Sequence, residues 1–375
     1  MSVDVSEAAG ESTHSQQSSV AAPRTERRPG QRAAGMADVA KLAQVSHQTV
    51  SRVLNSHPSV RPSTRERVLA AMAELDYRPN RLARALVTSR SGQIGVVTSG
   101  SAKFGPMSAL MAVEDAARLA GYAVNVATVR ESDLDGEESA HGMAQVLSAF
   151  DEQAVEAVVV IAPRISAVAA LAEIGSRAPL LLVASGVDPT ERFDVVSVDQ
   201  VLGARLVTRH LIEAGHRVIG HLSGPSDWVD ARQRKLGWES ELAAAGLEIG
   251  PLWEGDWSAE AGFALGQKLV AAGELPDAIV ASNDQMALGL LRAFGEAGIA
   301  VPGQVSVTGF DDIEGTAYFQ PPLTTVRQDF DALGAAVMHL LAQRLGRSAT
   351  ATTTAVDATP PIQPELVVRA SSRAR

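Results

Sequence analysis

A short segment, residues 44–55, places long polar side chains at helical spacing. The outward face of the expected helix carries His47, Gln48, Ser51 and Arg52. A glutamine amide can bond adenine at two points, and an arginine guanidinium can bond guanine or a phosphate. This chemistry suits the reading of base edges. The alternative that these residues leave open is an ordinary helical hairpin with a solvated polar face.

Two short helices around a tight turn would position this face. Val39, Leu42 and Ala43 keep helical spacing before residues 44–46 interrupt them, and the second helix turns Val50, Val53 and Leu54 inward. Ser46 is suited to cap that helix, because its hydroxyl can accept from a free backbone amide. The pattern is typical of a helix-turn-helix, whose second helix enters the major groove.

A third helix is expected to cover the first two. Pro62 suits a first helical turn, and the helix would extend to Leu75. Its predicted apolar stripe consists of Val68, Leu69, Met72 and Leu75.

The charge of the chain is divided unevenly along its length. The net charge of −10 separates into zero for residues 1–35, +5 for residues 36–90 and −15 for residues 91–375. Binding of DNA phosphates requires basic charge only where the duplex lies. The division therefore favours DNA binding by residues 36–90 over a plain hairpin.

Composition excludes several other classes of protein. The chain has no cysteine, so neither disulfides nor thiolate zinc sites are possible. It shows no secretory signal and no apolar run near the ~20 residues that span a membrane. We expect a cytoplasmic, nucleoid-associated protein without membrane contact.

The chain is expected to divide into five parts. Residues 1–35 should be a disordered extension, with Met36 as an alternative translation start. The helix-turn-helix domain would follow at 36–78, a basic hinge at 79–91 and a core at 92–370, before a tail at 371–375. Asn80 could cap a hinge helix too short to be stable alone, so either a plain linker or folding on DNA is possible.

The core alternates short β-branched runs with longer helical stretches, which predicts α/β architecture with parallel sheets. Strands are expected at 94–98, 123–127, 157–161, 180–183, 195–198, 218–222, 278–281 and 305–310, with a further one at 365–369. Helices are expected at 108–120, 203–214, 231–245, 259–272 and 285–297. Two lobes would divide near residue 190, the first at about 92–190 plus 323–350 and the second at about 191–320 plus 351–370. Ligands of such sheets bind where strands end, here between the lobes.

Six sequence motifs resemble the lactose repressor/galactose repressor family of bacterial transcription regulators. They are DVA at 38–40, VSHQTVSRVLN at 45–55, YRPN at 77–80, EGDWSA at 254–259, NDQMALG at 283–289 and PPLTTVRQDF at 321–330. The resemblance covers residues 37 to about 370 and points to the galactoside-responsive branch. It implies an all-α DNA-binding module followed by a two-lobed core like that of periplasmic binding proteins.

The resemblance also implies a homodimer that reads a pseudo-palindromic operator. Its DNA-binding positions are Ser46, His47, Gln48, Thr49, Ser51, Arg52, Asn55, Asn80 and Leu86. Leu86 falls where a hinge leucine wedges into the minor groove, although it could be a simple linker residue. His47 departs from the resembled pattern, which has tyrosine, so we expect a related but distinct operator. The C-terminal heptad helix that makes tetramers has no counterpart.

A sugar effector is the second implied ligand, and no other cofactor is expected. The implied contacts are Ser99, Arg234, Trp257, Asn283, Asp311, Gln328 and Phe330. Sugar hydroxyls need polar partners that bond at two points, and the apolar face of a pyranose needs an aromatic ring. Singly, such residues are more often structural. At Arg164 and Ile165 the resembled Leu-Asp pair is missing, which leaves the aglycone or linked sugar open.

The implied mechanism is release from DNA by an inducer through the hinge. A corepressor-dependent regulator of the same family is the nearest alternative. A sugar-binding transport protein would need an export signal and no helix-turn-helix. An enzyme is a further alternative, but phosphate-loop, dinucleotide and serine-nucleophile motifs are missing, and the histidines show no metal spacing. His210, His216 and His221 are predicted to be structural.

Overall fold

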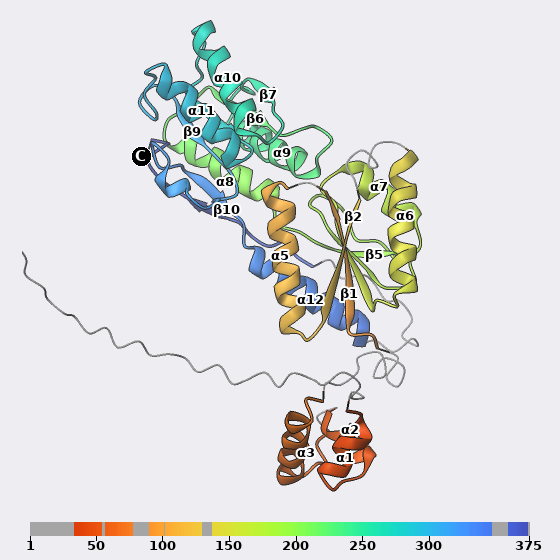
Figure 1. The fold of residues 1–375 in the computed structure, drawn as a ribbon. Coiled ribbons are helices and arrows are strands. Elements are labelled where there is room, and N and C mark those ends of the chain that lie inside the picture. Colours follow the sequence, from red (N-terminus) through yellow and green to blue (C-terminus); the bar gives the residue numbers. More distant parts are fainter. Residues whose placement is uncertain are drawn as a thin grey trace, which may run out of the picture. The chain divides into compact units, whose positions relative to one another are not determined.

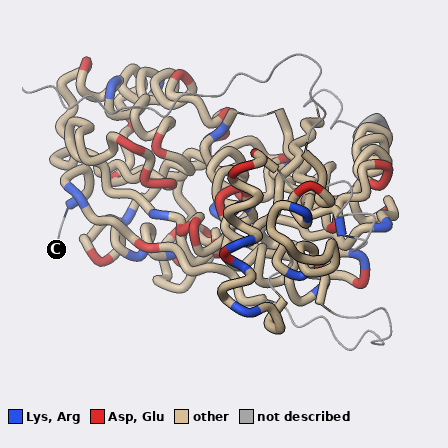
Figure 2. The backbone as a smooth tube through the Cα atoms, turned by 60° about the horizontal axis from the view of Figure 1, so that its bottom comes forward, with Lys and Arg blue, Asp and Glu red and all other residues tan. Residues whose placement is uncertain are grey.

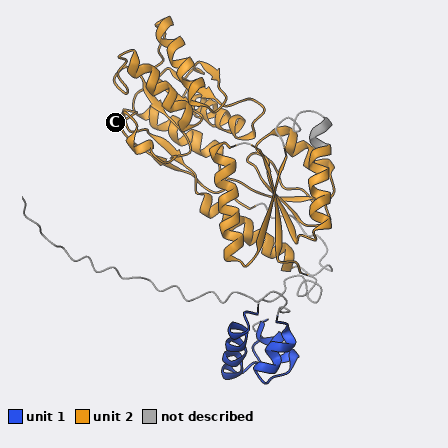
Figure 3. Ribbon diagram, viewed as in Figure 1, with its two compact units in different colours: residues 1–80 blue, residues 81–375 orange. Residues whose placement is uncertain are grey.

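The computed structural model describes residues 34–54, 57–77, 90–100, 102–129, 137–346 and 359–373. The chain divides into a small unit, residues 1–80, and a large unit, residues 81–375 (Figure 3). Several predictions fall outside the described residues. They concern residues 1–33, most of the hinge, the C-terminal residues 374–375 and the DNA-binding positions Asn55, Asn80 and Leu86.

The small unit is a helix-turn-helix followed by a third helix (Figure 1). Its helices are α1 (Met36–Leu42), α2 (His47–Leu54) and α3 (Pro62–Glu74). The three helices enclose a small core of Val39, Ala40, Ala43, Val50, Val53, Val68 and Ala71. The all-α module predicted from sequence is confirmed.

One residue of the predicted stripe on α3 does not face this core. Leu69 is 50% exposed, whereas its neighbour Val68 is fully buried. Successive residues of a helix point about 100° apart, so a stripe centred on Val68 and Ala71 turns Leu69 sideways. The prediction that Leu69 covers the first two helices is therefore wrong.

The first lobe of the large unit is built on a parallel sheet of order β2-β1-β3-β4-β5. Its strands are β1 (Gln93–Ser99), β2 (Ala123–Val129), β3 (Ala157–Ile161), β4 (Leu180–Val183) and β5 (Phe193–Val196). Helices α5 (Phe104–Leu119) and α12 (Phe330–Gly346) cover one face, and α6 (Glu137–Glu152) and α7 (Ile165–Glu173) cover the other (Figure 1).

The residues of β3 explain this layering. All five are buried, and neighbouring side chains point to opposite faces of the sheet. Val158 and Val160 pack against the α6–α7 side, whereas Ala157 and Val159 pack against the α5–α12 side. A strand buried on both faces reads as a continuous apolar run, as this one does.

The second lobe repeats the layered plan with a parallel sheet of order β7-β6-β8-β9. Its strands are β6 (Ile219–Ser223), β7 (Leu252–Glu254), β8 (Ala278–Ala281) and β9 (Ser306–Thr308). Its helices are α8 (Gln200–Glu213), α9 (Val229–Ala244), α10 (Ala259–Ala272) and α11 (Asp284–Glu296), and a short 3-10 helix, η2, spans Thr316–Tyr318. An antiparallel pair, β10 (Thr325–Arg327) and β11 (Glu365–Val367), lies beside β9.

Two predicted lobe boundaries need correction. The first sheet continues beyond the expected division near residue 190, because β5 pairs with β4 through Val196. Residues 323–327 were predicted in the first lobe. They lie in the second, where Thr324 pairs with Thr308 and Arg327 with Asp311. The chain therefore passes between the lobes at residues 197–199 and 328–329 and again near Ile362, which pairs with Val198.

The large unit carries the acidic excess of the chain, and its charged positions are marked in Figure 2. Among the described residues, no helix is long and apolar enough to cross a membrane, and no group of metal-binding side chains occurs. The three histidines predicted to be structural have protein partners. His210 bonds Ser372, His216 bonds Ser306, and His221 stacks on Trp238 at 5.1 Å.

Candidate functional site

The start of α2 is fixed by the predicted serine cap. Ser46 Oγ accepts from the Thr49 amide at 3.1 Å and lies 2.9 Å from the Thr49 hydroxyl. The turn before it contains Gln44 at φ 53°, a left-handed conformation that closes the chain between α1 and α2. The cap and the turn together set the direction in which the first side chains of α2 point.

Those first side chains form the polar surface expected from the sequence. His47, Gln48 and Arg52 are exposed, and Ser51 is half-buried. Thr49 is half-buried and bonded to Ser46, so its hydroxyl is engaged in the cap. Val50 and Val53 hold the opposite side of α2 in the core. The geometry thus presents long polar groups on a rigid helix, as major-groove reading requires.

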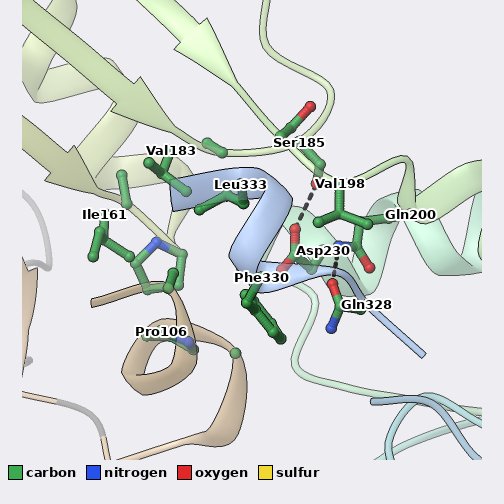
Figure 4. A pocket seen from close by; sticks show the side chains of 16 residues that line it. Pro106, Ile161, Val183, Ser185, Val198, Gln200, Asp230, Gln328, Phe330 and Leu333 are labelled. Atoms are coloured by element: carbon green, nitrogen blue, oxygen red, sulfur yellow. Dashed lines mark hydrogen bonds between the residues drawn. The ribbon is translucent and has the colours of Figure 1, made fainter. Parts of the chain in front are cut away.

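The second site is a cleft between the two lobes of the large unit, and it consists of two adjoining pockets. One is mostly apolar and is lined by residues such as Ile161, Val183, Val198, Phe330 and Leu333 (Figure 4). The other is polar and aromatic and is lined by Lys103, Phe104, Trp228, Arg234, Trp257, Asn283 and Asp311, among others. Both pockets share Gly105, Pro106 and Asp230, which makes the cleft continuous.

Three hydrogen bonds and an ion pair join four buried polar side chains into a ring at this cleft. Arg234 Nε donates to Gln200 Oε1 at 2.9 Å. Gln200 Nε2 donates to Gln328 Oε1 at 2.7 Å (Figure 4). Gln328 Nε2 then donates to Asp311 Oδ1 at 2.8 Å, and the Arg234 Nη2 atom lies 3.4 Å from the same oxygen. Gln200 and Gln328 lie at the ends of the segments that connect the lobes.

Two aromatic side chains lie close to the Arg234 guanidinium. The Arg234 Cζ atom lies 3.8 Å from the centre of the Phe310 ring and 5.6 Å from that of Trp257. Trp257 meets Trp228 edge to face at 5.4 Å, and its indole Nε1 is buried without a hydrogen-bond partner. Trp257 also has φ 72°, which is a strained conformation for a bulky residue. Such strain is concentrated at ligand sites.

Asn283 links this aromatic wall to α11. Its Nδ2 atom donates to the Trp257 carbonyl at 3.0 Å, and its Oδ1 atom caps α11 by accepting from the Met286 amide at 2.9 Å. Both ends of the amide are therefore engaged within the protein. The side chain thus fixes the backbone of Trp257 and also lines the polar pocket.

Burial shifts the pKa of Asp311, the acidic member of the four-residue ring. Desolvation raises the pKa of Asp311 from 3.8 to about 6; the Arg234 guanidinium opposes this rise, and the nearby Asp230 carboxylate adds to it. The ion pair thus only partly offsets the loss of water around the carboxylate. Asp311 remains largely ionised at neutral pH and is a strong hydrogen-bond acceptor.

The predicted effector residues are only partly brought together. Arg234, Trp257, Asn283 and Asp311 line the polar pocket, whereas Gln328 and Phe330 line the apolar one. Phe330 packs edge to face on Phe104, with 5.9 Å between ring centres. Ser99 lines neither pocket; it lies buried at the end of β1, and its hydroxyl has no partner.

Sequence reasoning missed several residues of the cleft, three of which matter most for its polar and aromatic lining. Gln200 completes the hydrogen-bonded ring, and Trp228 adds a second indole to the polar pocket. Asp230 faces both pockets and accepts a hydrogen bond from Ser185 of the first lobe (Figure 4). Asp230 precedes Arg234 by four residues, one turn of α9, so helical spacing from Arg234 could have found it.

Two residues that depart from the resembled pattern, Arg164 and Ile165, and a lysine of the polar pocket join the lobes. The guanidinium of Arg164, in the first lobe, pairs with the carboxylate of Asp227, in the second. The backbones of the two lobes also bond here, because the Ile165 amide donates to the Asp227 carbonyl at 3.0 Å. Lys103 Nζ donates to the Asp256 carbonyl at 2.9 Å. These positions therefore connect the two rims of the cleft.

Comparison with known proteins connects the two sites to one family. Residues 35–80 match the model of bacterial regulatory proteins of the lacI family, and residues 208–372 match a periplasmic binding protein-like domain. The chain is 39% identical over 314 residues to the lactose operon repressor of Escherichia coli (strain K12), covering 82% of this chain and 83% of that protein. The chain belongs to the lacI family.

Other relatives and solved structures agree with this membership. The repressor PurR of Pasteurella multocida (strain Pm70) is 31% identical, with 90% of this chain and 98% of that protein covered. A lac repressor dimer bound to operator and the anti-inducer ONPF matches with a TM-score of 0.76 at 34% identity, covering 92% of this chain and all of that chain. The regulator CelR in complex with cellobiose matches with a TM-score of 0.64 at 30% identity, covering 90% and 100%.

The family assignment supports the class of DNA-binding regulator among those considered from sequence. This lacI-family chain is a DNA-binding transcriptional repressor with an α/β core, and the relatives that establish its family are repressors rather than enzymes. The helix-turn-helix and the periplasmic-binding-protein-like core predicted from sequence are both confirmed.

Proposed function

We propose that this lacI-family repressor binds a pseudo-palindromic operator as a homodimer and is released by a galactose-type sugar. The inducer would occupy the polar pocket of the cleft between the lobes. The DNA contacts would come from α2, chiefly from its exposed residues His47, Gln48 and Arg52.

The observation that carries the proposal is the buried ring of Arg234, Gln200, Gln328 and Asp311 beneath the Trp257 indole. Vicinal sugar hydroxyls each donate and accept, and Arg234 and Asp311 offer paired donors beside a carboxylate acceptor. The apolar face of a pyranose can pack on an indole. The lining therefore matches a hydroxyl-rich ring with one apolar face.

The relatives indicate which class of sugar the cleft would bind. The lactose operon repressors of Escherichia coli and Klebsiella pneumoniae are 39% and 35% identical to this chain. The matched motifs around Trp257, Asn283 and Gln328 lie at the cleft. They favour a galactose-type ring, and the apolar pocket beside it leaves room for an aglycone.

Release would follow from linkage between the two ligands. A sugar that binds more tightly to a state with the lobes displaced must weaken operator binding by the same factor. A coupling of about 1–3 kcal/mol corresponds to a 5–150-fold change in operator affinity. Gln200 and Gln328 join the ring to the segments between the lobes, so a change at the sugar reaches the lobe connections directly.

Operator release is the direct test. The full-length protein is bound to a labelled fragment from the region upstream of its gene, and galactose, methyl β-galactoside and lactose are titrated while fluorescence anisotropy is recorded. We expect at least one galactoside to lower operator affinity by fivefold or more, with glucose as the matched control sugar. Release by none of the galactosides would refute the inducer assignment.

A corepressor mechanism is the second candidate, because repressors named PurR are also relatives of this chain, at 30–31% identity. The same titration separates the two mechanisms by the sign of the effect. An inducer lowers operator affinity, whereas a corepressor raises it.

A further inference from the structure

Asp284 is a buried acid that lies behind the cleft. It is the first residue of α11, is fully buried, and lines neither pocket. Among the described residues, its carboxylate partners are the Thr325 hydroxyl at 2.5 Å and the Ile313 amide at 2.9 Å. A buried carboxylate without a basic partner is costly to the fold, and the hydrogen bonds that it accepts offset part of that cost.

The turn that Asp284 contacts is strained. Asp311 has φ 109° and Asp312 has φ 53°, both in the left-handed region that glycine tolerates best. Residues in such conformations are energetically unfavourable and persist only when their surroundings fix them. Two in succession therefore need several fixed contacts.

Asp284 supplies contacts at both ends of that turn. Its backbone amide donates to the Phe310 carbonyl at 2.9 Å, before the turn, and its Oδ2 atom accepts from the Ile313 amide, after it. Its Oδ1 atom accepts from Thr325 Oγ1, which in turn accepts from the Asp312 amide at 3.4 Å. A Cβ atom at Gly309 would lie 2.1 Å from Asp284 Oδ1, so the incoming chain passes directly against the carboxylate.

We propose that Asp284 is a positioning residue for the effector site, which fixes the 311–313 turn so that the Asp311 carboxylate faces Arg234 and Gln328. The inference rests on the function proposed above, because it assigns Asp284 to the site where the sugar would bind. Asp284 itself does not touch the ligand. It acts as support for Asp311, and such support has to be rigid for a binding group to keep its direction.

Three variants test this role. Asp284→Ala removes both side-chain acceptors, and Thr325→Val removes only the hydroxyl that joins Asp284 to the Asp312 amide. Asp284→Asn keeps an oxygen for the Ile313 amide and offers its NH₂ to the Thr325 hydroxyl. The control is Asp277→Ala, which removes a carboxylate that also accepts from two backbone amides, those of Arg217 and Val218, outside both pockets.

Calorimetric titration with methyl β-galactoside measures the effect on the full-length protein. We expect the sugar Kd to rise at least tenfold in Asp284→Ala and about threefold in Thr325→Val, with Asp284→Asn close to the unchanged protein. Operator affinity without sugar should stay within twofold, and Asp277→Ala should lower the Tm without changing the sugar Kd. A purely structural role of Asp284 would move the Tm alone.

The outcomes that overturn the inference are separate from those that overturn the function. A folded Asp284→Ala protein with unchanged sugar Kd refutes the positioning role; if that variant does not fold, an unchanged Kd in Thr325→Val does so. If the unsubstituted protein binds no galactoside, the proposed function fails. In that case a crystal structure of effector-free Thr325→Val tests the positioning role. The role is refuted if Asp311 keeps its conformation and its hydrogen bond to Gln328.

Discussion

The two polar clusters of this repressor are built in opposite ways. On α2, His47, Gln48 and Arg52 are exposed to solvent on a helix that is fixed by its own cap and small core. At the cleft, Arg234 and Asp311 are 4% and 7% exposed and bond to side chains that are distant in sequence. One surface is held by local structure, and the other by tertiary contacts.

This difference separates stability from recognition. An exposed side chain can be exchanged with little change in folding free energy, so α2 can vary its DNA preference freely. A buried polar ring cannot lose one member without leaving the others unsatisfied. Substitutions at the cleft should therefore change stability and ligand binding together, whereas substitutions on α2 should change binding alone.

The largest effect is expected at the guanidinium of the ring. Arg234→Met retains most of the aliphatic stem but leaves the Asp311 carboxylate without its cation, and Gln200 and the Ser282 carbonyl lose their donor. Breaking a buried pair in this way costs about 3–5 kcal/mol. Urea denaturation should show that loss, and release from operator by galactosides should disappear.

Arg209→Met is the matched control for that prediction. Arg209 also pairs with a carboxylate, that of Glu241, but its side chain is 44% exposed. A partly exposed pair of this kind contributes about 1 kcal/mol or less. If the two methionine variants unfold at the same urea concentration, the contrast between buried and exposed polar groups is wrong.

The pH dependence of sugar binding should show the next effect. Burial raises the pKa of Asp311 to about 6, above its ordinary 3.8. Below pH 6 the carboxyl gains a proton and accepts a sugar hydroxyl less strongly, so the sugar Kd should rise as the pH falls from 7 to 5. Calorimetry across this range measures the change, and Asp311→Asn should flatten it.

Protonation of Asp311 should weaken sugar binding but stabilise the folded protein. Between pH 3.8 and 6 the folded protein holds a proton on Asp311 that the unfolded chain has released. The contribution of this group to stability is therefore present at low pH and is lost as the pH rises through 6, by on the order of 3 kcal/mol. The difference in stability between the unsubstituted protein and Asp311→Asn isolates it; a sugar affinity and a stability term that change in the same direction with pH would contradict the assignment.

The elements of the fold could be predicted where the signal is local. Strands β3, β4 and β8 and helix α10 have the predicted bounds, because their apolar runs are bordered by polar or turn residues. Helix α8 starts at Gln200, three residues before the prediction, because Asp199 caps it through the Leu202 amide at 2.8 Å. Apolar spacing alone does not show such a first turn, because the cap that fixes it is a side chain that accepts from a backbone amide.

The same limitation applies to the candidate cleft. Gln200 joins Arg234, 34 residues away, and Gln328, 128 residues away, and no local pattern marks such a residue. The left-handed conformations of Trp257 and Asp311 also arise from tertiary contacts. By contrast, the outward face of α2 follows from helical spacing alone, which is why the sequence identified it without the fold.

A smaller effect is expected at the cap of α2. Ser46→Ala removes the acceptor of the Thr49 amide and the partner of the Thr49 hydroxyl. Loss of such a cap costs about 1 kcal/mol of helix stability. Operator affinity should fall several-fold by anisotropy, whereas the sugar Kd should not change. Ser46→Asp, which restores an acceptor, should recover the helix, and a changed sugar Kd in Ser46→Ala would show that the two clusters are not independent.

The smallest effect on stability, and the sharpest effect on specificity, is expected at His47. Its side chain is exposed at the first position of α2, so His47→Tyr should alter folding free energy by less than about 0.5 kcal/mol. A phenol and an imidazole offer different hydrogen bonds to base edges, and one altered contact changes discrimination by about 1–3 kcal/mol. Selection of binding sites from random DNA should therefore yield a different preferred half-site for the variant.

Gln48 provides the comparison, because Gln48→Ala should weaken binding at its own base without shifting the preference that His47 sets. An unchanged half-site in His47→Tyr would mean that this position contacts only the backbone of DNA, and that exposure on the recognition helix is not by itself enough to mark a base-reading residue.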